Sequence, residues 1–305
     1  MEMLSAVIHR ASITNEKIIS IEICPKRKLD VDELNKLRPT FCSIVWHYDG
    51  SEIEHIPALV LLKKLSIHSK RLLLHVPGNC LSQTDVEKVL HSLKSAQVPN
   101  VLVLQGASSA TQSCKHFVYA IDLIKFIKRI YGNYFTIAVA AYPNCHPNSA
   151  TEWDDLVHLK KKVDAGVDFV ITQMVFNYEV FNNFCRKSKQ FLIDTPIIAG
   201  VFIISSYEGF MTMARLCKVE VSNEITSVLE ANRNNEESVQ NFGIFVCVSF
   251  IRQVLSHNND QVLGVHFFSL NKLRLVRKVC KILGFLDVHI ERPLSSAAST
   301  VLRHK

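Results

Sequence analysis

The sequence has no run of hydrophobic residues approaching the ~18–20 needed to cross a bilayer. Its first residues also lack the apolar core of a secretory signal. The longest apolar run, Gly243–Ile251, is interpreted as part of a buried helix. The nine cysteines include no C-x-x-C pair, which argues against a structural zinc site and a disulfide framework. These absences predict a soluble, cytoplasmic protein with reduced thiols, no metal and no membrane segment.

Basic residues are not concentrated in any part of the chain. The formal charge is +7 over 305 residues, and the longest basic run is KKK at 160–162. A nucleic-acid interface normally gathers such residues on one face, so we expect no nucleic-acid partner and favour an anionic small-molecule ligand. Hydrophobic residues make up 48% of the chain and charged residues 21%, which is enough for one large core.

Short runs rich in β-branched and aromatic residues alternate with segments of helical period, and the runs predict buried strands. The expected strands are Ile18–Ile23, Phe41–Trp46, Arg71–Val76, Asn100–Leu104, Ile137–Ala141, Phe169–Thr172, Pro196–Phe202 and Val262–Phe268. Helices are expected over Asp30–Leu37, Glu54–His68, Gln83–Ser95, Phe117–Tyr131, Tyr178–Lys187, Gly209–Cys217, Asn223–Glu230, Glu236–His257 and Asn271–Leu283.

Eight strands that alternate with helices over this length predict a single (β/α)8 TIM barrel. An open doubly wound sheet is the alternative, but no G-x-G-x-x-G follows the first strand to support it. We expect residues 1–290 to form the barrel and residues 291–305, rich in Ser, Ala and Arg, to form a flexible tail.

Polar residues stand at the ends of these strands, where a barrel of this type has its active site. In strand order they are Glu22, Trp46–His47, His75, Gln105–Gly106, Tyr142–His146, Gln173, Gly200 and Phe268–Asn271. Individual members have structural alternatives, such as a strand-edge carboxylate, a hydrogen-bonded core histidine or a helix cap. Their convergence at one barrel mouth predicts a single site.

A polar stripe follows the fifth expected strand. Its members Asp155, His158, Lys161 and Lys162 recur at i, i+3, i+6 and i+7, on a different helical face from the apolar residues. On spacing alone a solvated helix surface explains this stripe. The preceding loop, AAYPNCHPN at 140–148, contains two prolines with a tyrosine and a histidine, and it favours a functional site.

Four segments carry a resemblance to a known family. They are AAYPNCHP, DLVHLKKKVDAGVDFVITQ at 155–173, VWH at 45–47 and HFFSLNK at 266–272. They resemble motifs of the methylenetetrahydrofolate reductases, flavoproteins of one-carbon metabolism with a (β/α)8 barrel. The similarity spans roughly Ile18 to Gly284, so the chain looks like the catalytic module without the C-terminal regulatory domain of the eukaryotic enzymes.

The resemblance implies FAD as cofactor, NADPH or NADH as reductant, and a role in methionine biosynthesis. The cofactor-binding positions that it implies are Trp46, His75, Gln105, Gly106, Tyr119, Ala120, Tyr142, His146, Asp155, His158, Lys161 and Lys162. Lysines and a helix N-terminus suit the pyrophosphate of FAD, and carboxylate and imidazole groups suit its ribityl–adenosine arm.

The resemblance also implies catalytic and substrate-binding residues. The segment EICPK at 22–26 is similar to the family's EFFPPK, which implies that Glu22 is the general acid. It would protonate the folate amine so that the methylene bridge opens to an iminium able to accept hydride. Gln173 and Lys272 are implied to bind the folate.

The sequence departs from the family on the substrate side. The family's LRGD reads LQGA at 104–107, so Gln105 replaces an arginine and Ala107 an aspartate that contacts folate. Val45 replaces a threonine, Phe268 a tyrosine and Lys272 an arginine. A lost charged hydrogen bond costs about 1.5–3 kcal/mol, equivalent to a ten- to hundred-fold fall in rate if it acts in the transition state.

These departures leave alternatives open. The first is an active reductase, the second a non-catalytic relative that binds flavin or flavin and a pterin, and the third a flavin enzyme of altered substrate. A barrel without flavin is the remaining case. The sequence also leaves open the choice between NADH and NADPH and whether the chain forms a homo-oligomer.

Overall fold

The computed structural model describes residues 2–47, 51–65, 70–106, 116–256 and 259–286. Eight parallel strands form a closed barrel in sequence order, with β8 paired to β1. The strands are β1 (Ile18–Ile23), β2 (Phe41–Ile44), β3 (Leu72–Pro77), β4 (Asn100–Leu104), β5 (Thr136–Ala141), β6 (Phe169–Thr172), β7 (Ile197–Phe202) and β8 (Val262–Phe268). The predicted (β/α)8 barrel is therefore confirmed, and the open doubly wound sheet is excluded.

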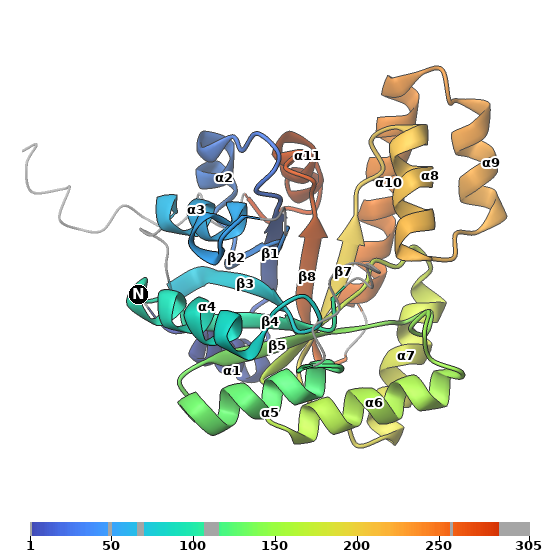
Figure 1. Cartoon of the computed structure of the whole chain (residues 1–305). Coiled ribbons are helices and arrows are strands. Elements are labelled where there is room, and N and C mark those ends of the chain that lie inside the picture. The colour runs from blue at the N-terminus through green and yellow to red at the C-terminus, as the bar shows by residue number, and fades with distance from the viewer. Residues whose placement is uncertain (1, 48–50, 66–69, 107–115, 257–258, 287–305) are drawn as a thin grey trace, which may run out of the picture.

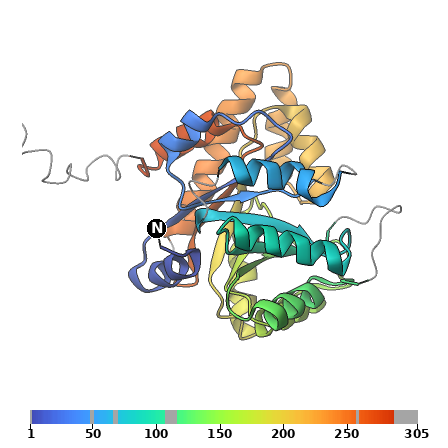
Figure 2. The same cartoon turned by 60° about the vertical axis from the view of Figure 1, so that its left-hand side comes forward.

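Helices cover the outside of the barrel (Figures 1 and 2). They are α1 (Leu4–Thr14), α2 (Val31–Leu37), η1 (Ile53–His55), α3 (Pro57–Lys64), α4 (Gln83–Ser95), α5 (Ala120–Tyr131), α6 (Glu152–Asp164), α7 (Tyr178–Gln190), α8 (Tyr207–Cys217), α9 (Asn223–Ala231), α10 (Glu236–Ser256) and α11 (Leu273–Ile282). The predicted boundary at 290 stays a prediction, because residues 287–305 lie outside the described part of the chain.

Several predicted element boundaries were wrong, and three of them have a local reason. The helix expected from Phe117 starts at Ala120, because Tyr119 is extended and its backbone N–H donates to the Asp122 carboxylate. The helix expected over Glu54–His68 is divided, because Pro57 starts a new helix after the short turn η1. The helix expected from Asn271 starts at Leu273, because Leu270 and Asn271 have φ angles of 46° and 61°. The strand expected to reach Trp46 ends at Ile44.

Alternate strand residues point into and out of the barrel. Inward side chains such as Phe41, Leu73 and Phe169 fill its centre, while outward valines, leucines and isoleucines pack under the helices. A barrel with a filled centre leaves its loops as the place for ligands. The carboxyl ends of the strands form the mouth, where Glu22 and Phe268 lie side by side in the β1–β8 register.

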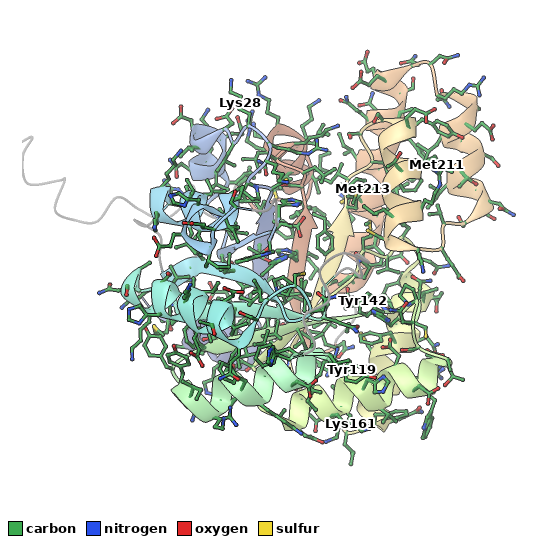
Figure 3. All side chains as sticks on the ribbon, in the orientation of Figure 1. Lys28, Tyr119, Tyr142, Lys161, Met211 and Met213 are labelled. Atoms are coloured by element: carbon green, nitrogen blue, oxygen red, sulfur yellow. The ribbon has the colours of Figure 1, made fainter. Side chains whose placement is uncertain are left out.

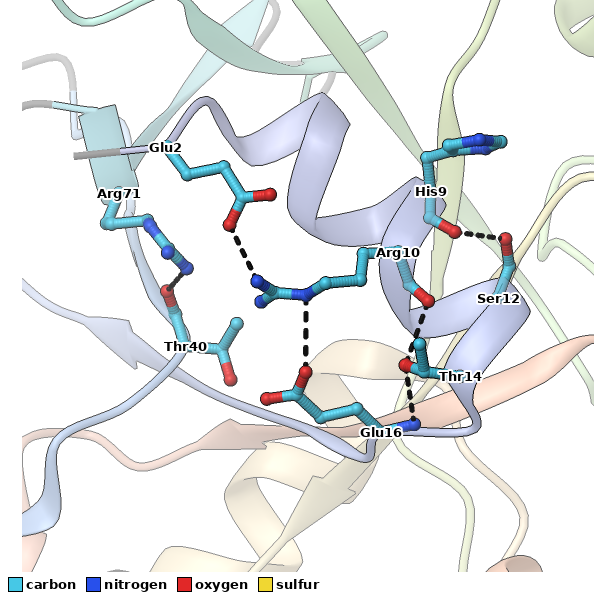
Figure 4. A network of polar contacts seen from close by, with 8 residues as sticks. All are labelled: Glu2, His9, Arg10, Ser12, Thr14, Glu16, Thr40 and Arg71. Atoms are coloured by element: carbon cyan, nitrogen blue, oxygen red, sulfur yellow. Dashed lines mark hydrogen bonds and ion pairs between the residues drawn. The ribbon is translucent and has the colours of Figure 1, made fainter. Parts of the chain in front are cut away.

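Helix α1 was not predicted, and it closes the opposite end of the barrel. Leu4, Val7, Ile8 and Ala11 recur at i, i+3, i+4 and i+7 and pack into the inner cluster. On its polar side Arg10 pairs with Glu2 at 3.0 Å and with Glu16 at 3.3 Å (Figure 4). The same helical period that identified other helices would have identified this one.

The long interval before β8 contains α8, α9 and α10, which stand on one side of the mouth (Figure 1). Among the described residues, α10 is the one helix long and apolar enough to cross a membrane by length and composition. One face of it packs against the barrel, and a Cβ on Gly243 would lie 2.1 Å from the carbonyl oxygen of Ile204. The predicted buried helix around Gly243–Ile251 is confirmed on this face, although Phe245 on another face is 66% exposed.

Candidate active site

A groove of ≈ 530 Å³ lies beside the ends of β4 and β5 and against α5 and α6. In Figure 3, Tyr142, Tyr119 and Lys161 follow one another along this side of the molecule. Nine of the twelve predicted cofactor-binding residues line it: Gln105, Tyr119, Ala120, Tyr142, His146, Asp155, His158, Lys161 and Lys162. Residues from the polar stripe, from the ends of β4 and β5 and from the start of α5 therefore surround one groove.

The loop after β5 is fastened to the start of α6 by Asp155. Its carboxylate accepts a hydrogen bond from the backbone N–H of His146 at 3.0 Å and from Ser149 Oγ at 3.4 Å. The ring of His146 meets that of Tyr142 edge to face, with centroids 4.4 Å apart. Burial raises the pKa of Asp155, while the hydrogen bond from His146 and the charge of Lys162 act in the opposite direction. Asp155 therefore fixes the groove wall as well as facing the groove.

The polar stripe of α6 is divided between solvent and protein. His158 and Lys161 are exposed, as the solvated-face alternative expected. Lys162 instead turns inward, where Nζ donates to the backbone oxygen of Ala140 at 3.2 Å. Burial lowers the pKa of Lys162, and the charge of Asp155 partly offsets this. A half-buried cation in the groove wall provides positive potential for an anionic ligand.

Three predicted cofactor-binding residues do not line this groove. Trp46 is buried in the outer cluster. Gly106 follows β4 with φ at 95°, and a Cβ there would lie 2.0 Å from Oδ1 of Asn79, so only glycine fits. His75 lies inside the barrel, 5% exposed, and its Nε2 has no hydrogen-bond partner among the described residues. Burial, with a contribution from His47, lowers the pKa of His75 to about 3.

The predicted catalytic and substrate-binding residues lie at the mouth. Burial raises the pKa of the Glu22 carboxyl to about 8, so this group keeps its proton at neutral pH. Gln173 uses Oε1 to accept a hydrogen bond from the backbone N–H of Met174. Lys272 Nζ donates to Ser205 Oγ at 2.6 Å and so links the ends of β7 and β8. Ala107 lies outside the described residues.

Polar groups inside the barrel were missed from the sequence. His266 is hydrogen-bonded through Nδ1 to Ser20 Oγ at 2.8 Å and through Nε2 to Ser43 Oγ at 3.2 Å. Burial lowers the pKa of His266 to about 3, with a smaller contribution from His75. The available signal was a polar residue at an inward position of an otherwise apolar strand. Closer to the mouth, Cys24 Sγ lies 3.3 Å from His47 Nε2.

The fold and this groove place the chain among the (β/α)8 barrels with a ligand-sized, polar groove at the carboxyl ends of their strands. Residues 10–284 match the family model described as methylenetetrahydrofolate reductase. The chain therefore belongs to the methylenetetrahydrofolate reductase family, which confirms the resemblance read from the motifs.

Individual relatives of the chain carry the name of the same family. The chain is 30% identical to methylenetetrahydrofolate reductase (NADH) 1 of Arabidopsis thaliana, over 84% of this chain and 45% of that protein. It is 28% identical to 5,10-methylenetetrahydrofolate reductase of Buchnera aphidicola, over 90% of this chain and 94% of that protein. The chain thus spans about half the length of the plant relative.

A solved structure shares the fold at 13% identity, with a TM-score of 0.63 over 90% of this chain and 99% of the other. It is an uncharacterised protein from Clostridium thermocellum that binds two copies of 5-methyl-5,6,7,8-tetrahydrofolic acid.

Proposed function

We propose that the chain catalyses FAD-dependent reduction of 5,10-methylenetetrahydrofolate to 5-methyltetrahydrofolate, with NADPH or NADH as reductant. Family membership supports the reaction class. The single observation that carries the proposal is the coexistence of a polar groove with a neutral carboxyl at the adjoining mouth. One feature suits a dinucleotide and the other suits proton donation to a folate amine.

The residues present fit a flavin dinucleotide. Lys161, Lys162 and the N-terminus of α5 give positive potential suited to its pyrophosphate, and the helix start at Tyr119–Ala120 lines the groove. Asp155 and His158 would hold the ribityl–adenosine arm. The buried, unpartnered Nε2 of His75 is a polar atom that a ligand in the barrel mouth would satisfy. When bound, the flavin supplies the hydride chemistry.

Glu22 is proposed to donate the proton. Burial raises the pKa of its carboxyl to about 8, so the carboxyl is protonated at neutral pH. Donation to the folate amine would open the methylene bridge and leave the carboxylate behind. Gln173 and Lys272 would then orient the pterin from the ends of β6 and β8.

Two measurements test the proposal in order of cost. An absorbance scan of the purified protein should show flavin bands. If the bands are absent, the remaining alternative holds, a barrel that binds no flavin. Anaerobic mixing with NADPH and, separately, NADH should bleach the flavin. Methylenetetrahydrofolate should then restore its colour. A flavin that stays oxidised with both nucleotides would rule out the reductase.

A second candidate is a non-catalytic relative that binds flavin or flavin and a pterin. The replacements at Ala107, Gln105, Val45 and Phe268 favour it. Gln105 Nε2 already donates to the backbone oxygen of Val118 at 3.1 Å. Complementation of a reductase-deficient methionine auxotroph separates the two functions. Growth at a near-normal rate would exclude the second candidate.

We also propose a cytoplasmic location, in line with the sequence prediction. Fractionation of cells that produce the tagged chain should recover it with cytoplasmic markers. Recovery in the membrane fraction would contradict a cytoplasmic location and would indicate α10 as the segment to test for membrane association.

A further inference from the structure

The hydrogen-bond ladder between β8 and β1 ends at the pair Phe268–Glu22. Side chains continue the connection beyond that point. Ser269 Oγ donates to the backbone oxygen of Glu22 at 2.8 Å, and the same hydroxyl accepts a hydrogen bond from the backbone N–H of Asn271 at 3.0 Å. The strand end that carries Glu22 is therefore tied to the loop after β8.

Asn271 makes the larger part of this connection. Its Oδ1 accepts from the backbone N–H of Cys24 at 2.9 Å, and its Nδ2 donates to the backbone oxygen of Cys24 at 2.9 Å. Nδ2 also lies 3.1 Å from the backbone oxygen of Arg27 and 3.4 Å from that of Lys28. The side-chain amide of Asn271 thus makes hydrogen bonds to the backbone of Cys24–Lys28, as a neighbouring strand would.

The backbone of Asn271 is adapted to this role. Its φ is 61°, and asparagine adopts the left-handed region more readily than other residues with a Cβ. In Figure 3 the segment ending at Lys28 lies on one side of the mouth, and Met211 and Met213 of α8 lie on the other. The loop held by Asn271 is therefore one wall of the mouth into which Glu22 projects.

We propose that Asn271 is a positioning residue for Glu22: its amide holds the Cys24–Lys28 loop at the mouth and so limits the access of water to the half-buried Glu22 carboxyl. The inference rests on the proposed function only for its effect on turnover, because the placement of the carboxyl is a property of the protein alone. Burial is the cause of the raised pKa of Glu22, so a loosened loop should lower that pKa.

Other titratable groups surround the carboxyl and must be controlled. Cys217 of α8 interacts with Glu22, whose charge contributes to the raised pKa of that thiol. Lys26, His47, His75 and His266 interact with one another in that order, and Lys272 follows β8. A signal assigned to Glu22 must therefore disappear in Glu22→Gln.

The test is an infrared titration of the substrate-free full chain, following the protonated-carboxyl band that Glu22→Gln removes. Asn271→Gly keeps the left-handed backbone accessible but deletes the amide. Asn271→Ser also deletes the amide and adds no charge near Glu22. The matched control is Asn15→Gly, because Asn15 has a φ of 57° at the end of α1, at the opposite end of the barrel.

The band should titrate near pH 8 in the wild type and about 1 unit lower or more in Asn271→Gly, with no change in Asn15→Gly. An unchanged titration in Asn271→Gly, an equal shift in Asn15→Gly, or a wild-type band already lost at acidic pH would each overturn the proposal. If Asn271→Gly does not fold, Asn271→Ser is judged by the same criterion.

Turnover gives a second readout. In Asn271→Gly the alkaline limb of the kcat profile should move down by the same interval as the infrared band, with the FAD content unchanged. A chain that never reduces methylenetetrahydrofolate would defeat the proposed function, and the infrared titration would still decide the role of Asn271.

Discussion

The groove beside α5 and α6 and the mouth around β8, β1 and β2 are built in different ways. The most charged wall of the groove comes from one continuous segment, residues 140–162, in which Asp155 and Lys162 contact backbone groups of the same β5–α6 unit. The mouth is assembled from distant segments, and Asn271 and Cys24 are 247 positions apart. The β5–α6 wall of the groove follows the family's motif, whereas Gln105 at the β4 end of the groove and Val45 and Phe268 at the mouth are replacements. A wall built from one continuous segment can therefore be recognised from its sequence motif. A site assembled from distant segments can be recognised only from the contacts in the structure.

The largest expected effect comes from Glu22 in the mouth, and it should concern the folate step but not the reduction of the flavin. Glu22→Gln should lower methylenetetrahydrofolate reduction by about 10²–10⁴-fold, because an amide cannot donate the required proton. Reduction of bound flavin by the nicotinamide should stay unchanged, since it needs no proton from Glu22. Stopped-flow measurement of each half-reaction checks this. Equal losses in both halves would mean that Glu22 supports the whole site rather than the folate step.

In the groove, removing the charge of Lys162 should weaken flavin binding without unfolding the protein. Lys162→Met should weaken FAD binding about 10–100-fold, the equivalent of ~1.5–3 kcal/mol for a charged hydrogen bond. Lys160→Met is the matched control, because Lys160 lies on the same helix and pairs with Asp164. Fluorescence titration of the apoprotein with FAD measures both variants. Equal affinity in the two variants would contradict a role for Lys162 at the flavin.

The sequence predicted the barrel and the groove well because both follow from local patterns. Alternating apolar runs define strands such as β5 and β6, and the i, i+3, i+7 spacing brings Asp155, His158 and Lys162 to one helix side. The inward turn of Lys162 was not predictable, because spacing does not distinguish a buried cation from a solvated one.

The arrangement of the mouth could not be predicted in the same way. Ser20, Ser43 and His266 come from three strands, and only barrel closure brings them within hydrogen-bonding distance. Trp46 lies two residues beyond the end of β2 and packs in the outer core, so its role at the cofactor stays a prediction.

A stability effect should distinguish the half-buried carboxyls of Glu22 and Asp155. Folded Glu22 holds its proton up to about pH 8, whereas the unfolded chain releases it near 4.5, so this group's contribution to stability is lost as pH rises through that window. Glu22→Gln should therefore be more stable than the wild type at pH 8 by about 1–3 kcal/mol, and no more stable at pH 4.5. Asp155→Asn should show a smaller gain, because the hydrogen bonds from His146 and Ser149 and the charge of Lys162 offset part of the effect of burial on Asp155. Urea denaturation at both pH values checks the pair.

The smallest effect concerns the altered wall of the mouth. Phe268 stands where the family has tyrosine, with its ring 5.2 Å from that of His266, and a Cβ on Gly200 would lie 2.6 Å from Phe268 Cε2. Because the ring is already held by these neighbours, Phe268→Tyr should add a hydroxyl without moving the wall. A new hydrogen bond to folate would be worth about 0.5–1.5 kcal/mol, which corresponds to a two- to ten-fold lower KM for methylenetetrahydrofolate. FAD affinity should not change, and Phe245→Tyr on the exposed face of α10 should change neither quantity. A Phe268→Tyr variant that altered FAD binding and left KM unchanged would show that the two regions are not separable, since the mouth would then be shaping the flavin site rather than the folate site.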